Sequence, residues 1–231
     1  MNRRRWAASL ALVVVMVSAC VRMSDGVPVV AGGAEPGLTS SAPTPTTGSG
    51  EADDAAPGVL PTTRTPIPSN TIACSQPIKP AMRMTALIDN PLAPRITVGV
   101  PDGWSITTGS GEVGGRLDGP GGMKATITIA LTQLEPAAAF RKYADDLMAE
   151  SAVSSVSIMP GELCGFSGQK LMGAWSDTPQ NAVEFEDRIV HIWTNSGNDY
   201  LVSVHVQAPT GSPGFDEAAA LLTQDFEVEL P

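Results

Sequence analysis

Only the last 160 residues of this chain have the composition that a packed core requires. Of the 40 residues from Ala31 to Asn70, 30 are Pro, Ser, Thr, Gly or Ala, and no aromatic residue occurs between Trp6 and Trp104. Ten of the 11 aromatic residues fall after position 71. A segment so poor in apolar side chains cannot bury enough surface to offset its chain entropy. We therefore predict a disordered Pro/Thr/Ser/Gly-rich tether over residues 20–71 and a folded domain over residues 72–231.

The first 19 residues have the features of an export signal. Three arginines are followed by a run of 14 residues, Trp6 to Ala19, in which only Ser9 and Ser18 are polar. That run is shorter than the roughly 20 residues of a membrane-spanning helix but suits the apolar region of a signal peptide. Small residues lead directly into Cys20. One interpretation of this pattern is an ordinary secretory signal with a chance cysteine.

The order of these features resembles the bacterial lipobox. The resemblance implies that a signal peptide over residues 1–19 is removed and that Cys20 is acylated, palmitate included. Two or more acyl chains anchor a protein stably, whereas one chain binds a membrane only marginally. We expect a lipoprotein held at the cell membrane, on its extracytoplasmic face, through lipidated Cys20.

The charge and the cysteine count exclude several classes of protein. Loss of the signal would remove three arginines and no acidic residue, which changes the net charge from −10 to −13. Nucleic acids and anionic lipid surfaces select basic proteins, so no nucleic-acid partner is expected. With three cysteines and two histidines in the whole chain, neither a structural zinc site nor another cofactor is expected.

If Cys20 carries lipid, two cysteines remain. Cys74 and Cys164 would lie in an oxidising compartment, where an even number of cysteines favours a disulfide. Two buried free thiols are the alternative. A catalytic role for either cysteine is disfavoured, because neither has a neighbouring base in the sequence.

Alternating patterns predict that strands dominate the domain. Apolar residues recur at every second position in segments that turn-forming residues separate. Two segments instead have helical spacing, one beginning at Pro136 and the other at the pair Ser212-Pro213. The fold class is therefore α+β, an antiparallel β-sheet with two main helices. The expected strands lie at residues 96–100, 104–106, 125–131, 153–159, 163–175, 189–194, 200–206 and 226–230.

The order of these elements resembles a known family. The strand Ile96–Val100 runs into Pro101-Asp102-Gly103-Trp104, and a helix, a long hairpin and a C-terminal helix follow. Together with the lipobox and the tether, this order resembles the mycobacterial LpqN/LpqT-type lipoproteins, which have a PsbP-like fold. The resemblance implies an α-β-α sandwich and a binding or accessory module without catalytic residues. We therefore expect no enzyme activity.

Three segments look like catalytic or cofactor motifs, but their surrounding sequence does not support those functions. Gly109–Gly114 spells G-x-G-x-x-G, but further glycines follow where a dinucleotide site needs a helix. We expect a mobile hairpin loop there. Gly165–Gly168 lacks the last glycine of a nucleophile elbow. The acidic residues Glu184, Glu186 and Asp187 are interpreted as a solvated strand entry.

The two histidines fall in the predicted hairpin. A three-residue loop would place His191 directly opposite His205, on the face that also carries Trp193. Two histidines are too few protein ligands for catalytic zinc. We interpret His191, Trp193 and His205 as a contact face, and a metal-binding or pH-sensing role is the alternative.

Two functions remain. The first is a non-catalytic adaptor that binds another envelope protein or a secreted protein. The second is a carrier or sensor of an apolar small molecule or an envelope lipid. A cavity of several hundred cubic ångströms would favour the carrier, and an exposed aromatic patch would favour the adaptor.

Overall fold

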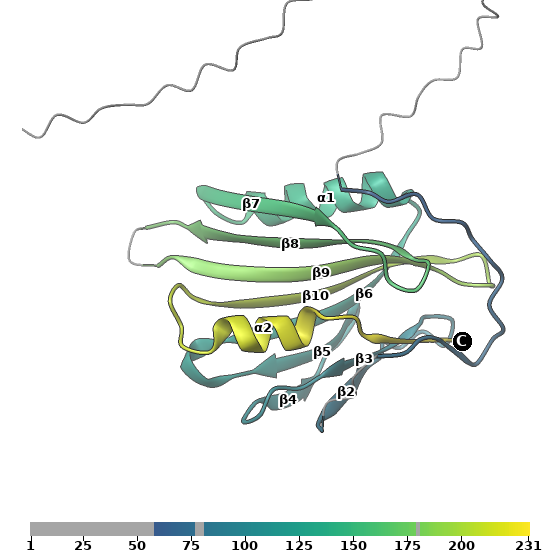
Figure 1. Ribbon diagram of the computed structural model, residues 1–231, viewed down its shortest axis with the longest axis horizontal. Helices are drawn as coiled ribbons and strands as arrows, with labels where there is room; N and C mark the ends of the chain where they lie inside the picture. The colour runs from purple at the N-terminus through teal and green to yellow at the C-terminus, as the bar shows by residue number, and fades with distance from the viewer. Residues whose placement is uncertain (1–57, 77–80, 179–180) are drawn as a thin grey trace, which may run out of the picture. The chain divides into compact units, whose positions relative to one another are not determined.

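Residues 58–76, 81–178 and 181–231 are described by the computed structural model (Figure 1). The predicted signal peptide, Cys20 and the first part of the predicted tether lie outside the described residues. Two β-sheets and two α-helices make up the domain, which confirms the α+β fold class. None of the helices in these described ranges is both long and apolar enough to cross a membrane.

A seven-stranded antiparallel sheet forms the centre of the domain. Its strand order is β4-β5-β6-β10-β9-β8-β7. The strands are β4 (Ser105–Thr108), β5 (Val113–Asp118), β6 (Lys124–Thr132), β7 (Val153–Pro160), β8 (Ser167–Ser176), β9 (Val183–Trp193) and β10 (Asp199–Pro209).

A smaller sheet has the order β1-β11-β3-β2, and the sequence patterns predicted two of its four strands, those at residues 96–100 and 226–230. Its strands are β1 (Thr71–Cys74), β2 (Arg83–Ala86), β3 (Arg95–Gly99) and β11 (Glu227–Leu230). The two strands that were not predicted, β1 and β2, have only four residues each, too few for a clear alternation.

The main core lies between one face of the large sheet, the small sheet and helix α2 (Phe215–Thr223). Side chains at even positions of β9 and β10 point to this side, and the apolar ones, such as Val190 and Val204, are fully buried. The predicted buried face of α2 is correct, since Phe215, Ala218, Ala219 and Leu222 are all buried.

The predicted start of α2 is wrong. The hydroxyl of Ser212 donates to the carbonyl of Pro209, 2.6 Å away, instead of capping the helix. Gly214, with a φ of 80°, is the residue that precedes the first helical residue. The turn at residues 209–212 takes the hydroxyl that would otherwise have served as the cap.

The opposite face of the large sheet carries helix α1 (Pro136–Ala149), which begins at the predicted proline. Phe140, Ala144 and Leu147 of α1 pack against Leu171, Phe185 and Ile189. The helix lies along the β7–β9 side of the sheet, as Figure 1 shows. The helix therefore covers only part of the β6–β10 region on this face of the sheet.

The hairpin loop expected at Gly109–Gly114 is present but shorter, because only residues 109–112 form the turn between β4 and β5. Residues Val113–Asp118 form β5, which pairs with β6 on one side and β4 on the other. Gly115 and Gly119 are in close contact with Met84 and Trp104, because an added Cβ would lie 2.4 Å from a side-chain atom in each case. These two glycines serve close packing.

The described end of the predicted tether lies against the domain. Arg64 donates two hydrogen bonds to the carboxylate of Asp199, at 3.1 and 2.7 Å, and the hydroxyl of Ser167 donates to the carbonyl of Leu60. The Asn195 amide donates to the carbonyl of Ile67, whose side chain packs against the main core. We call residues 58–70 the strap.

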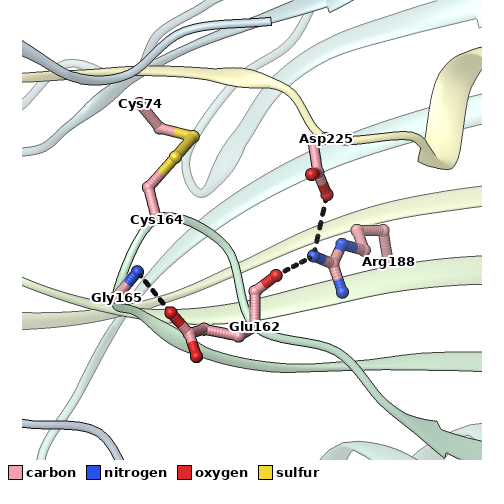
Figure 2. The surroundings of a disulfide bond; sticks show 6 residues. All are labelled: Cys74, Glu162, Cys164, Gly165, Arg188 and Asp225. Carbon is pink, nitrogen blue, oxygen red and sulfur yellow. Dashed lines mark hydrogen bonds and ion pairs between the residues drawn. A yellow bond between two sulfur atoms is a disulfide. The ribbon is translucent and has the colours of Figure 1, made fainter. Parts of the chain in front are cut away.

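Cys74 and Cys164 form a disulfide that joins β1 to the loop between β7 and β8 (Figure 2). The same loop is bound by the buried guanidinium of Arg188, which donates to the carbonyl of Glu162 at 2.9 Å and to the carboxylate of Asp225 at 3.1 Å. Burial lowers the pKa of Arg188, and the charge of Asp225 opposes that shift. The loop is thus fixed covalently on one side and by a charged hydrogen bond on the other.

Removal of the disulfide should destabilise the domain strongly. The cysteines are 90 residues apart, and closure of such a loop in the unfolded chain is worth up to about 4 kcal/mol. In the double variant Cys74→Ser, Cys164→Ser, the free energy of unfolding measured with urea should fall by most of this amount. Wild-type protein treated with a reductant is the matched control. A loss below about 1 kcal/mol in both would show that the disulfide contributes little.

Candidate functional site

A groove of about 660 Å³ lies between α1 and the part of the large sheet that α1 leaves open. Its floor is built from cross-strand pairs of β6 and β10, whose alternate side chains point to this face. Along the floor the pairs are Ala130 with Leu201, Thr128 with Ser203, Thr126 with His205, and Lys124 with Gln207.

The groove changes from apolar to polar along its length. At the end where β6 turns into α1, it is lined by Ala130, Leu131, Leu134 and Leu201. At the other end it is lined by Lys124, Thr126, Glu150, His205 and Gln207. Small hydroxyl-bearing residues on the floor leave room that larger side chains would fill.

A buried hydrogen-bonded group lies at the polar end. Asp187 of β9 is fully buried and pairs directly across the sheet with His205. Its Oδ1 lies 2.6 Å from Nδ1 of His205, and its Oδ2 accepts a hydrogen bond of 3.0 Å from the hydroxyl of Tyr143 on α1. Both carboxylate oxygens are thus satisfied, as a buried charge requires.

The imidazole of His205 is held on its other sides as well. Its Nε2 lies 3.1 Å from Oε1 of Gln207. The Trp175 ring stacks on it with a centroid distance of 5.6 Å and an interplanar angle of 7°. Only 19% of the His205 side chain is exposed.

The surroundings shift two pKa values. Burial lowers the pKa of His205, but the hydrogen bond and charge of Asp187 raise it more, so the net pKa lies above the ordinary 6.5. Burial, with Asp187 next, raises the pKa of Tyr143 well above 10.0. Tyr143 therefore stays protonated and donates to Asp187.

The predicted pairing of the two histidines is wrong. His191 pairs with Leu201, and His205 pairs with Asp187, because the turn between β9 and β10 is centred on Ser196, whereas pairing of the two histidines requires a turn centred on Asn198. The amide of Thr194 donates to the carbonyl of Asn198, so the residues within the turn are 195–197. The predicted parity is correct, so His191 and His205 do share a face.

The three residues of the predicted contact face are not exposed together. His191 is buried, with its Nε2 2.9 Å from the carbonyl of Leu134, and Trp193 is buried against Phe166. Only His205 lines the groove.

The sequence analysis missed four functional residues or assigned them elsewhere. Asp187 is a buried partner of His205 and not part of a solvated strand entry. Tyr143, Ser203 and Gln207 line the same groove. The odd numbering of Asp187, Ser203, His205 and Gln207 placed them on one face, and the missing information was the position of the turn between β9 and β10.

The arrangement is suited to hydrogen bonding. Both ring nitrogens of His205 are engaged within the protein. Within residues 58–76, 81–178 and 181–231, no group of three or more His, Cys, Asp or Glu side chains is placed to hold a metal ion.

The raised pKa of His205 makes stability depend on pH. The folded state holds the proton more tightly than the unfolded state, so the stabilisation is complete below about pH 6.5 and is lost as pH rises through the folded pKa. The difference in unfolding free energy between wild type and His205→Gln should therefore shrink over that range. Asp187→Asn should flatten the pH dependence. An equal slope in all three proteins would contradict the pairing.

The fold of this chain is similar to that of several solved structures. No family model and no curated protein matches the chain. The solved structure of LpqN from Mycobacterium tuberculosis, described as involved in cell envelope biogenesis, aligns with 65% of this chain and 91% of its own. The identity is 18% and the TM-score is 0.48.

Proposed function

We propose that this chain is an exported, lipid-anchored protein of the cell envelope whose domain binds a small amphipathic molecule in the groove beside α1. The observation that carries the proposal is the gradient of that groove, with leucines at one end and hydrogen-bonding groups at the other. Its volume of about 660 Å³ falls in the usual range for small-molecule sites.

The gradient defines the ligand class. An apolar chain would contact Leu131, Leu134 and Leu201, and a polar head would lie near Thr126, His205 and Gln207. The charged residues at the polar end include Lys124 and Glu150, of opposite sign. A head group that forms hydrogen bonds and carries little net charge therefore fits best.

The adaptor function that the sequence analysis put first stays a prediction. None of the ten aromatic side chains after position 71 is exposed, so the described surface has no aromatic patch. The observation in favour of a protein partner is the edge strand β7, where Val153, Ile158 and Met159 are exposed. An unpaired strand edge can accept a strand from another protein.

Native mass spectrometry of the protein extracted from its own envelope would separate the two functions. A small amphipathic adduct without a protein partner is expected. A second protein at fixed stoichiometry, with no adduct, would favour the adaptor.

A bulky residue in the groove should abolish ligand binding. Thr128→Trp would fill the middle of the floor, and we expect at least a roughly tenfold loss of affinity for N,N-dimethyldecanamide, measured by calorimetry. Thr107→Trp, at an exposed strand position outside the groove, is the matched control. Equal affinity in both variants, or no binding to the wild type, would overturn the proposal.

The lipid anchor is tested by expressing the wild type and the variant Cys20→Ser in the cells from whose envelope the protein is extracted. Wild-type protein should start at Cys20 and carry the mass of its acyl chains, whereas Cys20→Ser should carry none and leave the membrane fraction. Ligand binding by Cys20→Ser should equal that of the wild type, which would show that the substitution leaves the folded domain intact. Acyl mass on Cys20→Ser, or its absence from the wild type, would contradict lipidation at this residue.

A further inference from the structure

Both ring nitrogens of His205 lie against oxygen atoms. Nδ1 is 2.6 Å from Oδ1 of Asp187, and Nε2 is 3.1 Å from Oε1 of Gln207. Each contact is a hydrogen bond only if its nitrogen carries a hydrogen, so the two together require the doubly protonated ring. In this arrangement the carbonyl of the Gln207 amide points at the ring and its NH₂ group points away.

Loss of one proton would leave the two contacts unequal. Asp187 is a charged, buried acceptor at the shorter distance, so it retains the hydrogen on Nδ1. Nε2 would then present a lone pair to Oε1 of Gln207, which is repulsive. Rotation of the amide by about 180° exchanges its oxygen and nitrogen and restores a hydrogen bond, with the NH₂ group as donor. The terminal torsion of glutamine is broad, so such a rotation is readily accessible.

We propose that the protonation state of His205 sets the orientation of the Gln207 amide, and that the polar end of the groove thereby offers a ligand either a hydrogen-bond donor or an acceptor. The inference rests on the proposed ligand-binding function, because Gln207 lines the groove. With the ring doubly protonated, the free NH₂ group selects a head group that accepts. With the ring neutral, the free carbonyl selects a head group that donates.

Groups on every neighbouring element bear on this equilibrium. Asp187 on β9 acts directly on the ring, and Trp175 on β8 stacks on it without a charge. The other charged or titratable groups on this face include Tyr143 and the Lys142–Asp146 ion pair of α1, Glu150 directly after α1, Lys124 of β6, Arg116 and Asp118 of β5, and Glu112 before β5. Glu150 further favours the protonated ring, in the same direction as Asp187.

The first test needs no ligand. In the full-length protein, ¹⁵N NMR of the two histidines and of the glutamine side chains is followed between about pH 5 and pH 9. Nε2 of His205 should lose its proton while Nδ1 keeps its own, and the Gln207 amide signals should move with the same midpoint. Asp187→Asn should lower that midpoint. A neutral ring protonated at Nε2, or a Gln207 amide that does not follow the titration, would overturn the inference.

The second test uses N,N-dimethyldecanamide, which accepts hydrogen bonds but cannot donate them and does not ionise. Its affinity for the wild type should fall roughly 3- to 10-fold as pH rises through the midpoint, the effect of one net hydrogen bond. Gln207→Met, of similar length but without an amide, should remove that pH dependence. A dependence that persists in Gln207→Met would overturn the inference. Absence of binding at every pH would overturn the proposed function, and the NMR titration would still decide on the amide orientation.

Discussion

The pairing of β10 with β9 on one side and β6 on the other is the constraint on which the rest of the domain depends. Because side chains alternate, this register sends Val190, Val202 and Val204 into the main core. The same register leaves Asp187, Ser203 and His205 on the opposite face. A shift of the register by one residue would turn the charged side chains into the core. Burial of the apolar face therefore also determines which side chains lie on the polar face.

That division explains why a polar groove can exist in a stable domain. The main core lies entirely on the side of α2 and the small sheet, so α1 does not have to cover all of the other face. Its apolar residues contact β8 and β9 and leave the β6–β10 floor open. Asp187 is buried under α1, where Tyr143 and His205 satisfy its two oxygens.

Much of the architecture was predictable from local patterns, and the long-range details were not. The alternation in β6, β9 and β10, the start of α1 at Pro136 and the buried face of α2 follow from two periodicities and the position of a proline. Two strands of the small sheet, β1 and β2, were missed because four residues are too few to show a period. The Asp187–His205 pair was missed because register depends on where the turn is centred, and the turn is centred on Ser196, two residues before the predicted centre at Asn198. The ionisable site therefore became visible only with the fold.

The strap and the disulfide have a mechanical consequence for a protein attached to a surface through its N-terminal side. Tension applied through Gly58 would reach the contacts of Leu60 and Arg64 first, which are individually weak and would peel away one at a time. It would then reach Cys74, where the covalent bond carries the load to Cys164. The 89 residues between the two cysteines, which include β6 and α1, are bypassed. Tension on the N-terminal side of the domain would thus bypass one wall and half the floor of the groove.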